Sequence, residues 1–422
     1  MSLTMTEMLR QLQLPEPEAA SGFANRFEES VTGFSGLPEY MTMEFVRRYY
    51  PWVGGDEKHY TAFERVAEKV TASEALQLYA HHAHNVLFVY PLEECRFGSW
   101  PVLKAALGDD SGMFDFMIAM SAIPMWAETH RKMGIPENYS RASAEWLNGT
   151  LRIYNSAHPG CYGIDRSQVY WLRFNIDGKL FRIGRFEYMI EELPGYMPRV
   201  FRNKTTGKTI ALCGDNWGLF GDGTRMFNKG AEETIPLRAK VTEKDNHVYG
   251  IRISPTGKAV INEICDLDLN EYEEILHKGD FTPGMHIPGG GGMTVEKAYA
   301  SWQEALEFFP KYLNKTPKAI SCLSWIFNSS FERELPDSNL AKLMREVYLF
   351  PECSYGRDGA FFIFGRSDGD FSVYPQDNSV RKAFHRIVDA GELLKSGGMF
   401  ILPQEIREHN GNRYRREEKC TN

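Results

Sequence analysis

Four consecutive glycines at residues 289–292 separate a short apolar run that ends at Pro288 from an amphipathic pattern that begins after Thr294. Glycine lets backbone N–H groups approach a phosphate closely, and a helix N-terminus adds unpaired donors and the positive end of a dipole. We therefore predict a strand and a helix joined by an anion-binding loop. A glycine loop without a ligand is the alternative. The predicted loop residues are Gly289, Gly290, Gly291, Gly292 and Thr294.

The loop differs from two common phosphate-binding motifs. It lacks the Lys-Ser/Thr pair of a nucleotide-hydrolysing P-loop, and its spacing does not match the dinucleotide fingerprint with its later acidic residue. Nucleotide hydrolysis and dinucleotide binding are therefore disfavoured.

Three charged or titratable residues could move protons or bind a ligand. His286 directly precedes the glycines, where it could be a general base or a structural histidine. Arg185 and Glu187 would point to one side of a predicted strand, because side chains alternate along strands. This pair would line a cleft or form an exposed ion pair. We predict His286 and Glu187 as catalytic bases and Arg185 as a substrate contact.

Further predicted substrate contacts lie at the ends of predicted elements. Ser324 and Trp325 end a strand, and ligand clefts of open sheets form at strand ends. Asn339 follows Ser338 at a helix start, where N-capping alone explains the serine. Cys322 has no histidine near it in the sequence and is more typical of a buried thiol than of a nucleophile.

One histidine pair could suggest a metal site. His81 and His84 share a face of a predicted helix at a spacing of three residues. A metal site needs a third ligand, and the HExxH pattern is absent. We predict no metal site.

The bulk composition is that of an ordinary globular protein, with 422 residues of which 43% are hydrophobic and 25% charged. A net charge of −8 argues against a general nucleic-acid binder. The seven cysteines form no CxxC pair, and neither a secretory signal nor a bilayer-spanning apolar run is visible. We expect a cytoplasmic protein with reduced thiols and a small-molecule substrate, without a nucleic-acid or membrane partner. The oligomeric state stays open.

Helix and strand patterns divide the chain into two predicted domains. Residues 1–150 show helical spacing interrupted by prolines, and strand patterns with turn pairs such as Asp177-Gly178 dominate from about residue 155. We predict an α+β fold, with a helical domain at 1–150 and a mixed-sheet domain at 151–422. Predicted helices include 41–50, 57–70, 113–133, 137–148, 270–277, 338–348 and 378–394, and predicted strands include 168–174, 180–190, 248–254, 258–265, 319–325 and 360–365.

Several segments resemble a family of bacterial acyltransferases that join an N-acyltransferase N-terminal domain to a GNAT-like C-terminal domain. The resemblance covers roughly residues 150–415, and the helical first third fits it in kind. The segments are 284–291 (GMHIPGGG), 322–326 (CLSWI), 336–340 (PDSNL), 171–174 (WLRF), 183–187 (IGRFE), 378–383 (NSVRKA) and 397–400 (GGMF).

This resemblance implies a role for the glycine loop. GNAT enzymes bind the pyrophosphate of coenzyme A at a strand–loop–helix, with the thioester near a splayed pair of strands. The implied reaction moves an acyl group from acyl-CoA directly to an amine, after a base has removed a proton from the ammonium and while N–H donors stabilise the oxyanion. Acyl-CoA is expected as a cosubstrate, with no tightly bound cofactor.

Two other functions fit the same residues. The usual GNAT loop begins with Arg or Gln, whereas no basic residue leads into Gly289. This difference favours a non-catalytic protein that binds a metabolite or glycan in a GNAT-like cleft lined by aromatic side chains. The third function is a glycan- or peptidoglycan-modifying enzyme with another donor.

Overall fold

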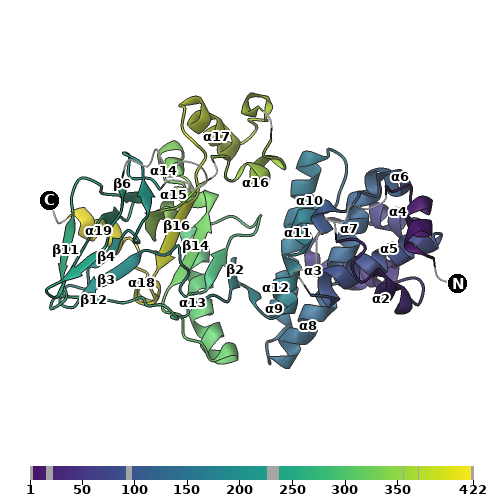
Figure 1. Cartoon of the computed structure of the whole chain (residues 1–422), viewed down its shortest axis with the longest axis horizontal. Helices are drawn as coiled ribbons and strands as arrows, with labels where there is room; N and C mark the ends of the chain where they lie inside the picture. The colour runs from purple at the N-terminus through teal and green to yellow at the C-terminus, as the bar shows by residue number, and fades with distance from the viewer. Residues whose placement is uncertain are drawn as a thin grey trace. The chain divides into compact units, whose positions relative to one another are not determined.

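The structure is a computed structural model that describes residues 3–15, 22–91, 97–225, 237–354, 356–368 and 370–419. Its packing divides the chain into two compact units, with the division between Arg182 and Ile183 (Figure 1). The first unit is helical, and the second combines sheets with helices. The predicted α+β fold with a helical domain first is confirmed.

The helical unit is built around α7 (Ser111–Met120), in which every residue is buried. A helix that is covered on all sides is typical of the centre of a helical domain. Phe114 and Phe116 of this helix are 0% exposed, as is Trp126 on the next helix. The other helices are α1 (Met5–Gln11), α2 (Phe27–Thr32), α3 (Met43–Val53), α4 (Tyr60–Thr71), α5 (Glu74–His84), α6 (Lys104–Leu107), α8 (Ile123–Lys132), α9 (Glu137–Ala144), α10 (Trp146–Ala157), α11 (Arg166–Val169) and α12 (Leu172–Ile176).

The helical unit extends past the predicted boundary after residue 150, which falls inside α10. Arg166 of α11 forms a buried ion pair with Asp115 of α7, with 2.7 Å between Nε and Oδ2. Leu172 of α12 is 1% exposed in the same hydrophobic core. The helices after residue 150 therefore complete the first core rather than begin the second.

From β1 onward, the described residues form a six-stranded sheet in the order β1-β2-β13-β14-β16-β15, and the strands after β1 lie in the second unit (Figure 1). β13 runs antiparallel to β2 and parallel to β14, whereas β16 runs antiparallel to both β14 and β15. The strands are β1 (Leu180–Ile183), β2 (Phe186–Met189), β13 (Gly284–His286), β14 (Ile320–Ser324), β15 (Tyr348–Pro351) and β16 (Gly397–Ile401).

Smaller sheets form between β2 and β13 of the chain. The largest has the order β10-β9-β4-β3-β12. Tyr348 of β15 joins it to the six-stranded sheet, because its hydroxyl donates to Ile253 O (2.6 Å) and accepts from Ala211 N–H (3.2 Å). The strands are β3 (Arg199–Asn203), β4 (Thr209–Leu212), β5 (Gly218–Leu219), β6 (Leu237–Arg238), β7 (Thr242–Lys244), β8 (His247–Gly250), β9 (Arg252–Ser254), β10 (Lys258–Ala259), β11 (Cys265–Asp268) and β12 (Tyr272–Glu274).

The long helix α13 (Val295–Leu313) covers one face of the six-stranded sheet. Trp302 of α13 stacks on Phe186 with 6.3 Å between ring centroids, and its Nε1–H donates to the sulfur of Met285. Because side chains alternate along a strand, Glu187 and His286 lie on the opposite face. The remaining helices are α14 (Ser330–Glu334), α15 (Asn339–Met344), α16 (Ala360–Phe364), α17 (Ser379–Asp389), α18 (Pro403–Glu408) and α19 (Arg413–Lys419).

Several predicted elements are confirmed, and others are wrong. The predicted strand 180–190 is two strands, β1 and β2, joined by a turn, and residues 260–264 of the predicted strand 258–265 are not in a strand. The strand–glycine loop–helix at 284–313 and the strand at 319–325 are present as predicted. Residues 168–174 are helical instead of a strand, because Gly178 at φ +65° ends a helix whose Phe174 carbonyl accepts from Lys179 N–H. Residues 272–274 pair with β3 as a strand, whereas 360–364 form a helix between two glycines of positive φ, Gly359 and Gly365.

Candidate functional site

β13 and β14 separate at the end that leads into the glycine loop. Gly284 is the register partner of Ser321, whose N–H donates to Pro283 O at 3.3 Å. β14 continues to Ser324, but within the described stretch 237–354 no later residue of it pairs with β13. The two parallel strands therefore stop pairing after Gly284 and Ser321, and a wedge between them opens towards His286.

The glycine loop adopts backbone conformations that favour glycine. Gly290, Gly291 and Gly292 have φ of +87°, +72° and +66°, and Gly289 precedes them as an equally exposed residue. Thr294 caps α13, since its Oγ1 accepts from Lys297 N–H at 3.4 Å. The orphan N–H groups of the first helical turn thus lie directly after the loop, as an anion site requires.

Two cationic side chains contact this loop, although no basic residue leads directly into Gly289. Arg185 Nε donates to Gly292 O at 2.6 Å, and Lys297 Nζ donates to Gly291 O at 2.6 Å. Arg185 lies in the two-residue turn between β1 and β2, so the prediction that it shares a strand face with Glu187 is wrong. Gly184 permits this turn with φ of +57°. Sequence analysis missed Lys297, although its position in the first helical turn after Thr294 could have indicated a cation beside the loop.

An acidic side chain occupies the same helix start. The pKa of Glu296 is lowered by a hydrogen bond from its own backbone N–H and by another from the Thr294 hydroxyl. A carboxylate here complements the helix dipole. Glu296 would therefore compete with a bound phosphate for the same donors.

The two predicted bases face each other on the sheet. Glu187 and His286 are direct register partners in the antiparallel β2–β13 pair, on the face opposite α13. Glu187 is 2% exposed, so the alternative of an exposed ion pair with Arg185 is wrong. Burial lowers the pKa of His286 to about 4, which favours the neutral imidazole.

Sequence analysis missed a second acidic group on this face. Glu191 reaches over Gly284, where an added Cβ would lie 2.5 Å from its Oε2. Burial raises the pKa of Glu191, and a hydrogen bond from Tyr196 partly offsets this. The Tyr196 hydroxyl also lies 3.3 Å from Ser321 Oγ. Glu191, Tyr196 and Ser321 therefore meet where β13 and β14 begin to separate, and only the glycine at 284 hinted at this approach.

The other predicted substrate contacts have interactions that do not involve the glycine loop. Ser324 ends β14, and its Oγ accepts from Ile326 N–H at 3.3 Å. Trp325 packs on Phe384, with 5.7 Å between ring centroids, and lies against Gly359. Asn339 is the exposed first residue of α15. None of these interactions brings the three residues to the glycine loop.

The cysteine and the histidines that were considered for nucleophilic or metal chemistry are explained by burial and by hydrogen bonds within the protein. Cys322 is 2% exposed, and burial raises the pKa of its thiol, so little thiolate forms. His81 Nε2 lies 3.1 Å from the side-chain amide of Asn85, and His84 Nδ1 lies 2.6 Å from Ser121 Oγ. The described part of the chain holds no group of three potential metal ligands.

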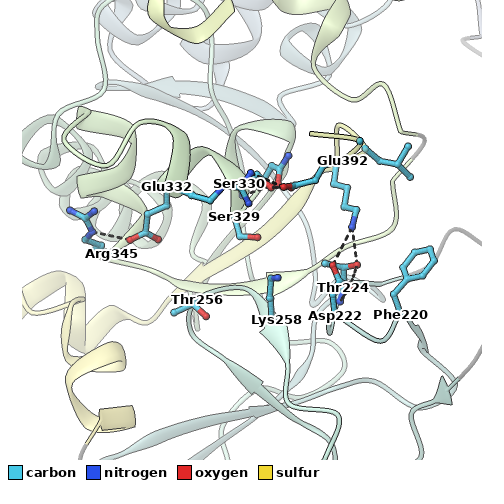
Figure 2. Close-up of a pocket in the computed structure, with 15 residues that line it drawn as sticks. Phe220, Asp222, Thr224, Thr256, Lys258, Ser329, Ser330, Glu332, Arg345 and Glu392 are labelled. Carbon is cyan, nitrogen blue, oxygen red and sulfur yellow. Dashed lines mark hydrogen bonds and ion pairs between the residues drawn. The ribbon is translucent and has the colours of Figure 1, made fainter. Parts of the chain in front are cut away.

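A cleft of about 870 Å³ opens elsewhere in the second unit (Figure 2). Its walls come from five chain segments, which include the turn between β9 and β10 and the start of α14. Its lining residues are Phe220, Asp222, Thr224, Thr256, Lys258, Asn328, Ser329, Ser330, Glu332, Arg333, Arg345, Gly391, Glu392, Leu393 and Lys395. No helix of the described residues is long and apolar enough to cross a bilayer.

Comparisons with known proteins agree with this topology. A crystal structure of an acyltransferase in complex with decanoyl-CoA and teicoplanin is similar over 95% of this chain and 99% of its own, with 16% identity and a TM-score of 0.59. A second, with decanoyl-CoA, is similar over 95% and 100%, with 18% identity and a TM-score of 0.56. No curated protein matches the sequence. The model of the GNAT-like C-terminal domain matches residues 180–400, just over half of the chain, which therefore belongs to this family.

Proposed function

We propose that the protein moves an acyl group from acyl-CoA to an amine of a small-molecule acceptor. The observation that carries the proposal is the separation of β13 from β14 beside the glycine loop. Strand edges inside such a wedge present backbone N–H and C=O groups to the pantetheine arm of CoA. Solved relatives that are acyltransferases in complex with decanoyl-CoA or octanoyl-CoA support the same donor.

The glycine loop would hold the pyrophosphate. Backbone N–H groups of Gly289, Gly290, Gly291 and Gly292 and of the helix start after Thr294 donate to its oxygens. Arg185 and Lys297 exchange their loop carbonyls for phosphate oxygens, because charge-assisted hydrogen bonds are stronger than neutral ones. Acyl-CoA is then a cosubstrate, and no tightly bound cofactor is needed.

Proton transfer would occur on the sheet face opposite α13. His286 takes a proton from the acceptor ammonium, and Glu187 stabilises the imidazolium that forms. The neutral amine attacks the thioester carbonyl, and N–H groups at the open wedge stabilise the oxyanion. The carbon–sulfur bond then breaks and Tyr196 gives a proton to the leaving sulfur. The nitrogen of the new amide passes its extra proton to Tyr196, which restores the hydroxyl. Glu191 is the second candidate for the base, because burial raises its pKa whereas burial lowers the pKa of His286.

The acceptor would lie near the end of β14. Ser324 and Trp325 are proposed contacts there, and Asn339 is a proposed contact from the start of α15. A solved relative that holds teicoplanin together with decanoyl-CoA supports a small-molecule acceptor. The intracellular supply of acyl-CoA makes the cytoplasm of a bacterial cell the proposed location.

A non-catalytic binding protein is less well supported. That alternative depended on the lack of a basic residue before the loop, and Arg185 and Lys297 supply two cations to it.

Binding and turnover of acyl-CoA test the proposal. Thermal unfolding is followed with CoA, octanoyl-CoA and decanoyl-CoA, and a ligand at 100 times its Kd should stabilise the protein by about 2.7 kcal/mol. Thiol release is then measured with a panel of amines. A Gly291→Val variant serves as the control, since valine at φ +72° is strained and fills the loop. The absence of a thermal shift with every acyl-CoA would contradict the proposal.

A further inference from the structure

Two carboxylates that line the 870 Å³ cleft already have arginine partners. Glu332 accepts from Arg345 Nε at 2.9 Å and from Arg415 Nη1 at 2.8 Å. Glu392 pairs with Arg333 at 2.7 Å and accepts from the Ser330 hydroxyl at 2.8 Å. These carboxylates are neutralised inside the protein and leave no strong site for a cation.

The third carboxylate of the cleft is outnumbered by lysines. Asp222 Oδ1 accepts from the Thr224 hydroxyl at 2.7 Å, and Lys395 lies 3.7 Å from its other oxygen. The charge of Lys258 also helps to lower the pKa of Asp222, after stronger contributions from Thr224 and Lys395 that oppose its desolvation. Lys395 is thus the ion-pair partner of Asp222, and Lys258 adds a second positive charge without an ion pair of its own among the described residues, which leaves this side of the cleft with an excess positive charge.

Two donors of the cleft lack partners. Asn328 is 4% exposed and its Oδ1 accepts from Ser330 N–H at 3.1 Å, but its buried Nδ2 has no hydrogen-bond partner among the described residues. A buried amide of this kind is unfavourable unless a ligand or water accepts its proton. Lys258 is an exposed lining residue without an ion pair within the described ranges, and Figure 2 places it across from Ser329 and Ser330.

We propose that this cleft binds the carboxylate of a small organic acid, with Lys258 supplying the charge and Asn328 a hydrogen bond. The groups of the cleft that remain available to a ligand are hydrogen-bond donors and one positive charge. Such groups bind an oxygen anion of low charge better than a cation or an apolar chain. A volume of about 870 Å³ fits the usual range of small-molecule sites.

The cleft also lies near the wedge. Asn328 follows Ser324 by four residues, so their Cα atoms lie within about 14 Å. A carboxylate in the cleft could therefore anchor an acceptor whose amine reaches the end of β14. This extension rests on the proposed function, whereas the binding site itself does not.

Isothermal titration of the full-length protein without any CoA tests the site with N-acetylglycinate and succinate as probes. Succinamide is the uncharged comparison, and inorganic phosphate is the other anion. We expect saturable binding of a carboxylate with a Kd of about 1 mM, a level typical of weak single-anchor sites. Lys258→Met should weaken it about tenfold, and Asn328→Asp should do the same, because it keeps the acceptor for Ser330 N–H but replaces the donor by an anion.

Lys240→Met is the matched control, since Lys240 is an exposed lysine outside the cleft. Unchanged affinity in Lys258→Met, equal binding of succinamide, tighter binding of phosphate than of both carboxylates, or no carboxylate binding would each overturn the proposal. Because no CoA is present, carboxylate binding without any acyl-CoA shift would contradict only the proposed function.

Discussion

Glu187 and His286 are direct partners across the antiparallel β2–β13 pair. Directly opposed residues on one sheet face have Cβ atoms about 4.5–5.5 Å apart, close enough for their side chains to interact. Two residues that are 99 positions apart in the sequence, 286 − 187, therefore form one unit on the face opposite α13.

This pairing predicts non-additive kinetics. His286→Gln should lower kcat by about 100-fold if the imidazole takes the proton of the acceptor, a typical contribution of a general base. Glu187→Gln should add little to His286→Gln, because its effect acts through the imidazole. The measurement is a double-mutant cycle of kcat with acyl-CoA and a saturating amine. Fully additive effects of the two substitutions would show that they act separately.

The cations at the glycine loop should control CoA affinity. Arg185→Gln and Lys297→Gln should each raise the Kd of CoA by about five- to tenfold, and added salt should reduce these differences. Lys311→Gln is the matched control, because Lys311 is exposed in the last turn of the same helix. Calorimetric Kd values at two salt concentrations test this. Equal losses in Lys311→Gln would place the effect in overall charge instead of the loop.

Removing the acid at the helix start should have the opposite effect. Glu296→Gln frees N–H donors of α13 and removes a negative charge, so the Kd of CoA should fall by about three- to tenfold, whereas the helix loses about 0.3–1 kcal/mol of dipole stabilisation. Glu307→Gln, at an exposed position of the same helix, should leave the Kd unchanged. An unchanged Kd in Glu296→Gln would mean that the phosphate does not use these donors.

The glycine loop shows what local sequence could predict. Four glycines followed by Thr294 specify a capped helix start, and that geometry depends only on neighbouring residues. The cations at the loop were harder to predict. Arg185 reaches Gly292 from a turn 107 residues earlier, and such a contact depends on the pairing of strands in the sheet.

Short apolar segments were the main source of error. Residues 360–364, AFFIF, were predicted as a strand, because five apolar residues fit a buried strand and a buried helix equally well. Tertiary packing decides such cases. Glu191 was overlooked for a related reason, since its approach to Gly284 depends on the β2–β13 register and not on a local motif.

Glu191 and its neighbour Glu192 allow a matched test of the second acid on the sheet face. If Glu191 instead of His286 is the base, Glu191→Gln should lower kcat by about 100-fold with little change in the Kd of acyl-CoA, whereas exposed Glu192→Gln should leave both unchanged. Tyr196→Phe should move the acidic limb of the pH profile to higher pH, because its hydrogen bond lowers the pKa of Glu191. Equal kinetics of the two Glu→Gln variants would exclude Glu191 from proton transfer.

His130 should make the helical unit sensitive to acid. It is 0% exposed, its Nδ1 lies 2.9 Å from Ser140 Oγ, and burial lowers its pKa from 6.5 to about 4. The unfolded chain therefore binds a proton that the folded state does not, so stability is full above pH 6.5 and falls as the pH drops towards 4. The loss from this group is about 3 kcal/mol, at 1.36 kcal/mol for each pKa unit.

His130→Leu should be less stable at pH 7 because of the lost hydrogen bond, but it should lose less stability than the native protein between pH 7 and pH 4.5. Exposed His158→Leu is the control and should keep the native pH response. Denaturant unfolding at both pH values gives the two free energies. If His130→Leu keeps the native difference between them, His130 takes up its proton without opposing the fold, and the acid response must come from other groups such as His82 and His84, whose pKa values burial also lowers to about 4.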